Sequence, residues 1–218
     1  MTTSANIYFM DGHRLGQESS LQFVAQTALP TAKGTLYVRA YRDKNDGSEP
    51  LALFYKQPHE GVEIPVRVHD ACMTSEVLGS LKCDCDGQLH YALDYVREHG
   101  GVVIYLPQEG RGIGLANKIA AYSLQEQGLD TIEANRALHL PIDARRYDGA
   151  ADILRDMGIH SIQLMTNNPR KIDKLKEQNV HITKRLDVHI PANPHSIGYL
   201  QTKRAHMGHL LGKIQHSS

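Results

Sequence analysis

The stretch 67–89, RVHDACMTSEVLGSLKCDCDGQL, holds all three cysteines of the 218-residue chain: Cys72, Cys83 and Cys85. Three thiolates can occupy three corners of a zinc tetrahedron and leave the fourth open, an arrangement typical of catalytic rather than structural zinc sites. Buried free cysteines can also be simple small hydrophobic residues. A neighbouring side chain can complete a closed site as a fourth ligand: His69, Asp84 or His90. The spacing alone leaves a metal site and inert thiols equally open.

Composition narrows the class of protein. Disulfides are not expected, because the cysteine count is odd and no secretory segment opens the chain. Lys and Arg total 24 against 24 Asp and Glu, so net charge favours neither a nucleic acid nor a membrane surface as partner. No apolar run reaches the length of a bilayer span, and the polar N-terminus lacks a signal or transit pattern. We expect a cytoplasmic protein.

Periodicity predicts strands before the cysteines and helices alternating with strands after them. Segments 34–42, 51–55 and 65–69 have strand patterns, which we expect to form an antiparallel meander. Later segments predict helices at 88–98, 112–127, 147–157 and 169–178, with short strands at 100–107 and 161–166. We therefore expect an α+β fold with a mixed β-sheet core and flanking helices, closed by a helix near 197–211. The expected boundaries are an arm at 1–30, one catalytic domain at 31–212 and a tail at 213–218.

Residues 108–114, QEGRGIG, lie between a predicted strand and a predicted helix. Glycines at such a turn let the backbone approach a ligand closely, and helix N-terminal amides favour anions. Arg111 adds a guanidinium suited to phosphate. A tight turn with a solvated arginine is the alternative.

Residues 166–171, TNNPRK, also follow a strand and precede a helix, where a phosphate would meet the helix N-terminus. An Asn-Pro turn with an asparagine cap explains most of this pattern. Lys171 needs a further reason, because the helix dipole disfavours cations in the first turn.

Two further places carry candidate chemistry. Asp143 and Arg145 can serve proton transfer and phosphate stabilisation, or can simply begin the next helix. Tyr122 shares a helix face with Lys118 and Leu115, and is either a core residue or a group that meets the metal.

Six motifs, taken together in order, resemble the GTP cyclohydrolase II family of riboflavin synthesis over about residues 66–211. The motifs are R-V-H-x-x-C-x10-C-D-C-x-x-Q, Q-E-G-R-G-I-G-L-x-N-K-I-x-A-Y-x-L-Q, D-T-x-E-A-N, D-x-R, T-N-N-P-x-K and K-x-x-x-M-G-H-L-L. The resemblance implies that thiolate-bound zinc activates water for attack on C8 of guanine, so that the imidazole ring opens and formate leaves. It also implies loss of pyrophosphate, giving a diaminopyrimidinone ribosyl monophosphate. Magnesium on the triphosphate and a homodimer are implied as well.

The resemblance assigns roles by position. It implies zinc at Cys72, Cys83 and Cys85, Asp143 as proton acceptor, and Tyr122 as an aid to ring opening. For Arg145 it implies a nucleophile or an α-phosphate stabiliser, and we favour the electrostatic role because a guanidinium stays protonated. Glu109 suits the N1–H and amino edge of guanine. The implied nucleotide-binding residues are Arg67, Val68, His69, Asp70, Ala71, Gln88, Glu109, Gly110, Arg111, Thr131, Thr166 and Lys171.

The chain departs from the family pattern beside the metal and phosphate positions. Asp70-Ala71 stands where Ser-Glu is usual, Thr74-Ser75-Glu76 where Thr-Gly-Asp is usual, and Leu106-Pro107 where a polar or basic pair is commoner. These departures motivate one alternative, a divergent homologue that acts on another nucleotide or stops part-way. A second alternative is a non-catalytic nucleotide-binding protein with a structural zinc.

Overall fold

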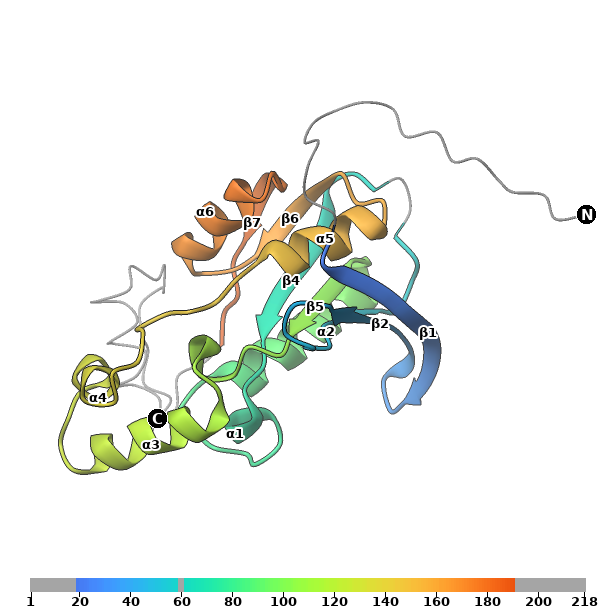
Figure 1. Cartoon of the computed structure of the whole chain (residues 1–218). Helices are drawn as coiled ribbons and strands as arrows, with labels where there is room; N and C mark the ends of the chain where they lie inside the picture. Colours follow the sequence, from blue (N-terminus) through green and yellow to red (C-terminus); the bar gives the residue numbers. More distant parts are fainter. Residues whose placement is uncertain (1–18, 59–60, 191–218) are drawn as a thin grey trace, which may run out of the picture.

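The computed structural model describes residues 19–58 and 61–190. Within these residues one seven-stranded sheet has the order β1-β2-β3-β5-β4-β6-β7 (Figure 1). Its strands are β1 Leu21–Thr31, β2 Gly34–Asp43, β3 Leu51–Phe54, β4 Ile64–Asp70, β5 Val102–Leu106, β6 Ser161–Met165 and β7 His181–Leu186. The sheet and its flanking helices confirm the expected α+β fold with a mixed sheet.

The sheet changes direction at β5. Strands β1, β2, β3 and β5 pair antiparallel, whereas β5, β4, β6 and β7 pair parallel. The expected antiparallel meander is therefore correct for β2 and β3 but wrong for β4, which lies in the parallel half between β5 and β6. The reason is α2, Cys85–His99, which carries the chain from β4 to β5 as a crossover connection and so makes the two strands parallel.

Helices cover both faces of the parallel half. On one face α5, Asp148–Asp156, and α6, Pro169–Glu177, bury residues such as Ile153 and Leu175 against Val66, Ile104 and Leu164 of the strands. On the other face α2 packs on a second core cluster, formed by Leu53, Ala92, Val96, Val103, Met165 and Val188. Of the parallel strands, β5 (VVIYL) is a continuous apolar run, as expected for a strand buried on both faces, whereas β4, β6 and β7 carry polar residues.

The remaining helices surround one edge of the sheet. They are α1 Met73–Glu76, a 3-10 turn at Glu109–Gly112, α3 Leu115–Glu126 and α4 Thr131–Ala137. Asp130 begins α4 with a capping box, in which its carboxylate accepts from the backbone N–H groups of Ile132 and Glu133. In Figure 1, α3 and α4 extend away from the sheet beside α1.

Several elements differ from the sequence-based expectation. Residues 21–31 form the strand β1, paired along its length with β2, whereas the sequence analysis placed them in an arm. Helix α4 and strand β7 were not predicted, because short polar segments such as His181–Leu186 carry a weak strand pattern. The expected helix near 197–211 lies outside the described residues.

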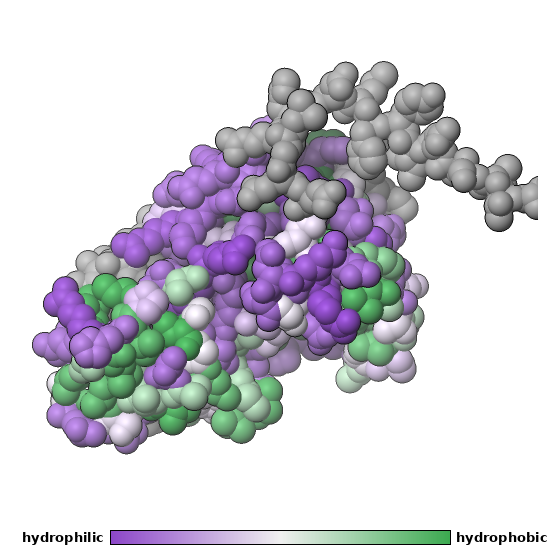
Figure 2. All heavy atoms as spheres, viewed as in Figure 1, coloured by the Kyte–Doolittle hydropathy of each residue, from purple (hydrophilic) through white to green (hydrophobic). Residues whose placement is uncertain are grey.

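Hydrophobic side chains gather on the surface over α1, the turn that follows it and α3 (Figure 2). The most exposed are Val77 and Leu78, at 70% and 69%, with Leu81 and Ile119 about half exposed, at 56% and 49%. None of the helices within residues 19–58 and 61–190 is long and apolar enough to cross a membrane.

The link between α2 and β5 depends on two adjacent glycines with different surroundings. Gly100 and Gly101 both have positive φ, at 81° and 124°. A Cβ on Gly101 would lie 2.3 Å from the carbonyl oxygen of Pro65 in β4, whereas one on Gly100 would meet nothing within 4 Å.

We expect Gly100→Ala to cost about 1–3 kcal/mol of unfolding free energy, the usual price of a non-glycine residue in such a backbone conformation. Gly101→Ala should cost clearly more, because its methyl group also forces β4 and β5 apart. Urea unfolding of the two variants measures the difference, with Gly100→Ala as the matched control. Equal losses of unfolding free energy in the two variants would show that the close approach to Pro65 does not determine the need for glycine at position 101.

Candidate functional site

A pocket lies at the carboxyl edge of the parallel strands. Strand β4 ends at Asp70, β5 at Leu106 and β6 at Met165, and the segments that follow these three strands all line it. The carboxyl ends of parallel strands are the usual place for ligands in such sheets. The pocket has a volume of about 440 Å³, and helices α3 and α4 supply its outer wall.

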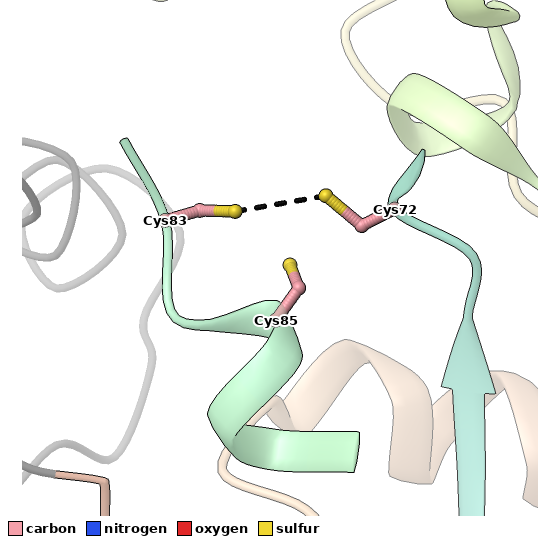
Figure 3. Close-up of side chains that lie close together, drawn as sticks. All are labelled: Cys72, Cys83 and Cys85. Carbon is pink, nitrogen blue, oxygen red and sulfur yellow. Dashed lines mark hydrogen bonds between the residues drawn. The ribbon is translucent and has the colours of Figure 1, made fainter. Parts of the chain in front are cut away.

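The three cysteines lie close together and line this pocket (Figure 3). Cys72 lies two residues after the end of β4, whereas Cys83 and Cys85 lie at the start of α2. Their sulfur atoms all lie within 4.8 Å of one another, and those of Cys72 and Cys83 are 3.6 Å apart. We call these residues the three-cysteine cluster.

The electrostatics of the three-cysteine cluster favour thiolate at Cys72. Hydrogen bonds from Cys83 and Cys85 hold the pKa of the Cys72 thiol far below its usual value, and the ammonium of Lys118 adds to this effect. The pKa of Cys83 is raised in turn, because it is the hydrogen-bond partner of Cys72. A low-pKa thiolate is the form that binds metals.

Lys118 connects the three-cysteine cluster to the loop after β5. Its Nζ lies 3.1 Å from the sulfur of Cys72, and 2.7 Å from both Thr74 Oγ1 and Glu109 Oε1. Glu109 Oε2 accepts a hydrogen bond of 2.6 Å from the backbone N–H of Met73. Both oxygens of Glu109 thus contact protein donors, so this carboxylate holds the loop against α1. Its expected contact with guanine stays a prediction.

Asp70 forms a second group of buried charges that lines the pocket. Its Oδ2 accepts from Arg145 Nη1 and Lys171 Nζ, each at 2.9 Å, and from the Tyr147 hydroxyl at 3.2 Å. Burial alone would raise the pKa of Asp70, but Lys171 and Arg145 outweigh it and hold the pKa well below its usual range. Burial lowers the pKa of Lys171 to about 8, although Asp70 opposes this shift. We call Asp70, Arg145, Tyr147 and Lys171 the Asp70 cluster.

Asp143 holds Arg145 in place. Its two carboxylate oxygens accept from Nε and Nη2 of Arg145 at 2.9 and 2.8 Å, a bidentate pairing that fixes the guanidinium plane. The pKa of Arg145 is raised despite its burial, because Asp143 and Asp70 stabilise the cation. The pKa of Asp143 is lowered by the same contact, against the effect of burial. Arg145 is therefore a fixed positive charge.

The QEGRG loop positions the segment that carries Arg145. The side chain of Gln108 donates to the carbonyl of Arg146 and accepts from its N–H, both at 2.7 Å. The Arg111 carbonyl accepts from the N–H of Ala144 at 3.0 Å. Arg111 has a φ of 63°, so the loop holds a non-glycine residue in the left-handed region.

Two further polar networks support the pocket wall. Arg67 donates to the Met165 carbonyl at 3.0 Å and to the Gln88 side chain at 2.5 Å. His69 contacts Glu76 through Nε2 at 2.8 Å, and burial lowers the pKa of this histidine, which keeps it neutral. Glu76 also accepts from the Tyr105 hydroxyl at 2.7 Å. Most polar groups in the wall are thus oriented by the protein before any ligand binds.

The structure brings nearly all of the predicted site residues into this one pocket. Val68 is the clearest exception, since its side chain is fully buried in the core beneath the pocket. Asp143 does not line the pocket either, but it contacts Arg145, which does. The predicted residues that line it are Arg67, His69, Asp70, Ala71, Cys72, Cys83, Cys85, Gln88, Glu109, Gly110, Arg111, Tyr122, Thr131, Arg145, Thr166 and Lys171.

Sequence reasoning missed the residues that act through others. Lys118 was noted only for sharing a helix face with Tyr122, and Gln108 and Tyr147 were given no role of their own, whereas the expected asparagine cap is confirmed at Asn168. Asn168 caps α6 by accepting from the N–H of Arg170, which sets the start of the helix that carries Lys171. A lysine at a buried helical position was the one available signal for Lys118.

The three-cysteine cluster fits a metal ion. Three sulfur ligands within 4.8 Å of one another match the soft donor set that zinc prefers. Among the described residues, no other group of three or more histidine, cysteine or carboxylate side chains gathers in this way. The cluster also opens into the pocket, so a bound metal would face the ligand.

Comparisons with known proteins agree with this geometry. The sequence model of the family described as GTP cyclohydrolase II matches residues 22–187. A GTP cyclohydrolase-2 of Picrophilus torridus is 45% identical over 192 residues, which cover 87% of this chain and 99% of that protein.

Longer relatives match as well. The riboflavin biosynthesis protein RibBA of Aquifex aeolicus is 45% identical over 200 residues, which cover 91% of this chain and 49% of that protein. RibBA of Bacillus mycoides is 44% identical over 200 residues, with coverage of 91% and 50%. The chain thus spans about half the length of these RibBA proteins. Since the family model matches most of the chain, and a relative of similar length shares 45% of its residues, the chain belongs to the GTP cyclohydrolase II family.

Proposed function

We propose that the protein hydrolyses GTP, opening the guanine imidazole ring with release of formate and pyrophosphate, as the first step of riboflavin synthesis. The observation that carries this proposal is that one pocket joins a three-cysteine cluster to a buried cluster of cations. The reaction has two separate parts, one at the base and one at the α-phosphorus. A pocket with two chemically different clusters suits a substrate that reacts both at its base and at its α-phosphorus.

The ring opening would take place at the three-cysteine cluster. Cys72, Cys83 and Cys85 would hold zinc, which supplies a Lewis acid that lowers the pKa of water toward neutrality. Tyr122 also lines the pocket, one helical turn after Lys118, whose Nζ contacts Cys72. Its hydroxyl would hold or move a proton at the guanine ring as the imidazole opens.

The Asp70 cluster would bind the triphosphate. Arg145 lines the pocket as a cation fixed by Asp143, so it would stabilise charge at the α-phosphate as pyrophosphate leaves. The raised pKa of Arg145 supports this electrostatic role over a nucleophilic one. Lys171 and Thr166 would contact the phosphates from the start of α6. A role for Asp143 as proton acceptor stays a prediction.

Further parts of the proposal rest on the family. Magnesium would accompany the triphosphate, the protein would act as a homodimer, and its location would be the cytoplasm. The domain boundary at residue 212 also stays a prediction.

One observation favours a second candidate, a divergent member that acts on another nucleotide or stops part-way. Asp70 pairs with both Arg145 and Lys171, so two of the cations expected to meet phosphate already share a carboxylate. Incubating zinc-loaded protein with GTP and magnesium, and scoring formate and pyrophosphate separately by mass spectrometry, decides between the two. Release of both supports the proposal, whereas pyrophosphate alone supports the second candidate.

We expect Cys83→Ser and Tyr122→Phe to separate metal binding from chemistry. Cys83→Ser should lose both the bound metal and formate release, because two thiolates hold zinc poorly. Tyr122→Phe should keep the metal and lose formate release by about 10²–10⁴-fold, the usual contribution of a positioned proton donor or acceptor. Metal content by mass spectrometry and formate assays measure both effects. Normal formate release from metal-free Cys83→Ser would contradict the proposed role of the cluster.

Arg145→Gln should slow pyrophosphate release by about 10²–10³-fold, the scale seen when one electrostatic stabiliser is removed. The matched control is Arg146→Gln, since the Arg146 side chain is exposed and pairs with Asp148 outside the pocket. Thermal melts of both variants show whether the fold is retained. Similar rates for the two variants would argue against a role for Arg145 at the α-phosphate.

Nucleotide affinity should fall as pH rises through about 8, because Lys171 then loses the proton that gives it positive charge. The expected loss is about tenfold or more, since a charge-assisted contact contributes about 1.5–3 kcal/mol. Lys171→Arg should flatten this pH dependence, because arginine stays charged. Calorimetry in the Tyr122→Phe background, with a GTP analogue bridged by a methylene between the α- and β-phosphorus, measures it. An unchanged slope in Lys171→Arg would assign the titration to another group.

A further inference from the structure

We propose that Lys118 is a positioning residue for the metal centre. Its ammonium donates a hydrogen bond to the sulfur of Cys72 and so tunes how strongly that sulfur donates charge to the metal. This inference rests on the proposed function only in taking the three-cysteine cluster to be the metal site. It concerns a residue that would contact neither the metal nor the reacting atoms.

Lys118 is held for this task by three contacts from different parts of the chain. Lys118 is buried, with 9% of the residue exposed. Its ammonium contacts Cys72 Sγ, Thr74 Oγ1 and Glu109 Oε1, at 3.1, 2.7 and 2.7 Å. An ammonium has three N–H donors, so these three acceptors use its full donor capacity. The Nζ atom therefore cannot rotate away from the sulfur without losing a buried hydrogen bond.

Charge balance explains why a lysine stands here. Three thiolates around a divalent metal give a net charge of about −1. A buried net charge is costly unless an opposite charge lies close to it. Lys118 supplies part of that opposite charge, because its Nζ lies 3.1 Å from the sulfur of Cys72, and it shares the charge with Glu109 at 2.7 Å.

The hydrogen bond also changes the ligand. An N–H group directed at a thiolate draws electron density from the sulfur, so Cys72 donates less charge to the metal. Partners of this kind tune both the affinity and the Lewis acidity of a metal centre. Three thiolates donate strongly and would make zinc a weak acid, which Lys118 would partly offset.

The same ammonium links the three-cysteine cluster to Tyr122. Tyr122 lies four residues after Lys118 on α3, and the Lys118 Nζ lies 5.7 Å from the centre of its ring. Glu109, the partner of Lys118 in the QEGRG loop, also contacts Met73 beside Cys72. Lys118 thus fixes α3, the loop and the end of β4 relative to one another.

The test is the absorption spectrum of the protein loaded with Co²⁺, which reports directly on sulfur donation. Lys118→Met removes the ammonium and keeps the length of the side chain, so the sulfur-to-cobalt charge-transfer band should move to longer wavelength. Lys118→Arg, which keeps a charged donor, should restore the band toward the wild-type position.

Lys82→Met is the matched control. Lys82 also lines the pocket and lies 4.8 Å above the ring of Tyr122, but its ammonium pairs with Glu126 at 3.2 Å. Loss of this charge should leave the Co²⁺ band in place. An equal shift in Lys82→Met would show a general effect of charge and overturn the proposal.

An unshifted band in folded Lys118→Met would also overturn it. If that variant does not fold, Lys118→Gln is the alternative. It keeps an uncharged donor and should shift the band in the same direction by a smaller amount. A wild-type spectrum from Lys118→Gln would refute the inference. The spectrum needs no GTP, so a shifted band without formate release would overturn the proposed function and support the role of Lys118. Failure of the wild-type protein to bind Co²⁺ would overturn both.

Discussion

Because β5, β4 and β6 lie side by side and run parallel, the segments that leave their carboxyl ends meet over one edge of the sheet. Cys72 follows β4, the QEGRG loop follows β5, and Thr166 follows β6. Motifs that are up to about a hundred residues apart in the chain therefore line one pocket. The antiparallel half of the sheet takes no part in the pocket and extends the core on the other side.

Compensation of buried charge decides how this edge is organised. Asp70 contacts Arg145 and Lys171 in one cluster, and Lys118 contacts Glu109 and the sulfur of Cys72 in the other. Each cation has its partners in place before a ligand arrives, so little reorganisation is needed when charge develops during a reaction. Removing one member of such a buried pair leaves the other unpaired, which costs more than the pair itself contributes.

Much of this arrangement could be predicted from the sequence, and the rest depends on contacts that no local pattern encodes. The three-cysteine cluster, the QEGRG loop and the residues after β6 were found because each has a motif with a chemical reason. The parallel direction of β4 was missed, because a strand's direction is set by its crossover and not by its own residues. Gln108 and Lys118 were missed because their partners, Arg146 and Cys72, lie 38 and 46 residues away in the chain.

Asp70 and Cys72 lie two residues apart at the end of β4, yet Asp70 contacts Arg145 and Lys171, whereas Cys72 belongs to the three-cysteine cluster. A change that alters the path of the chain at Ala71 therefore reaches both clusters at once. Substitutions here should be strongly epistatic, so the effect of one residue depends on which residue occupies its neighbour. Evolution along this segment would proceed through combinations of changes, and transplanting a single residue from a relative would be a poor guide to what that residue does in its own protein.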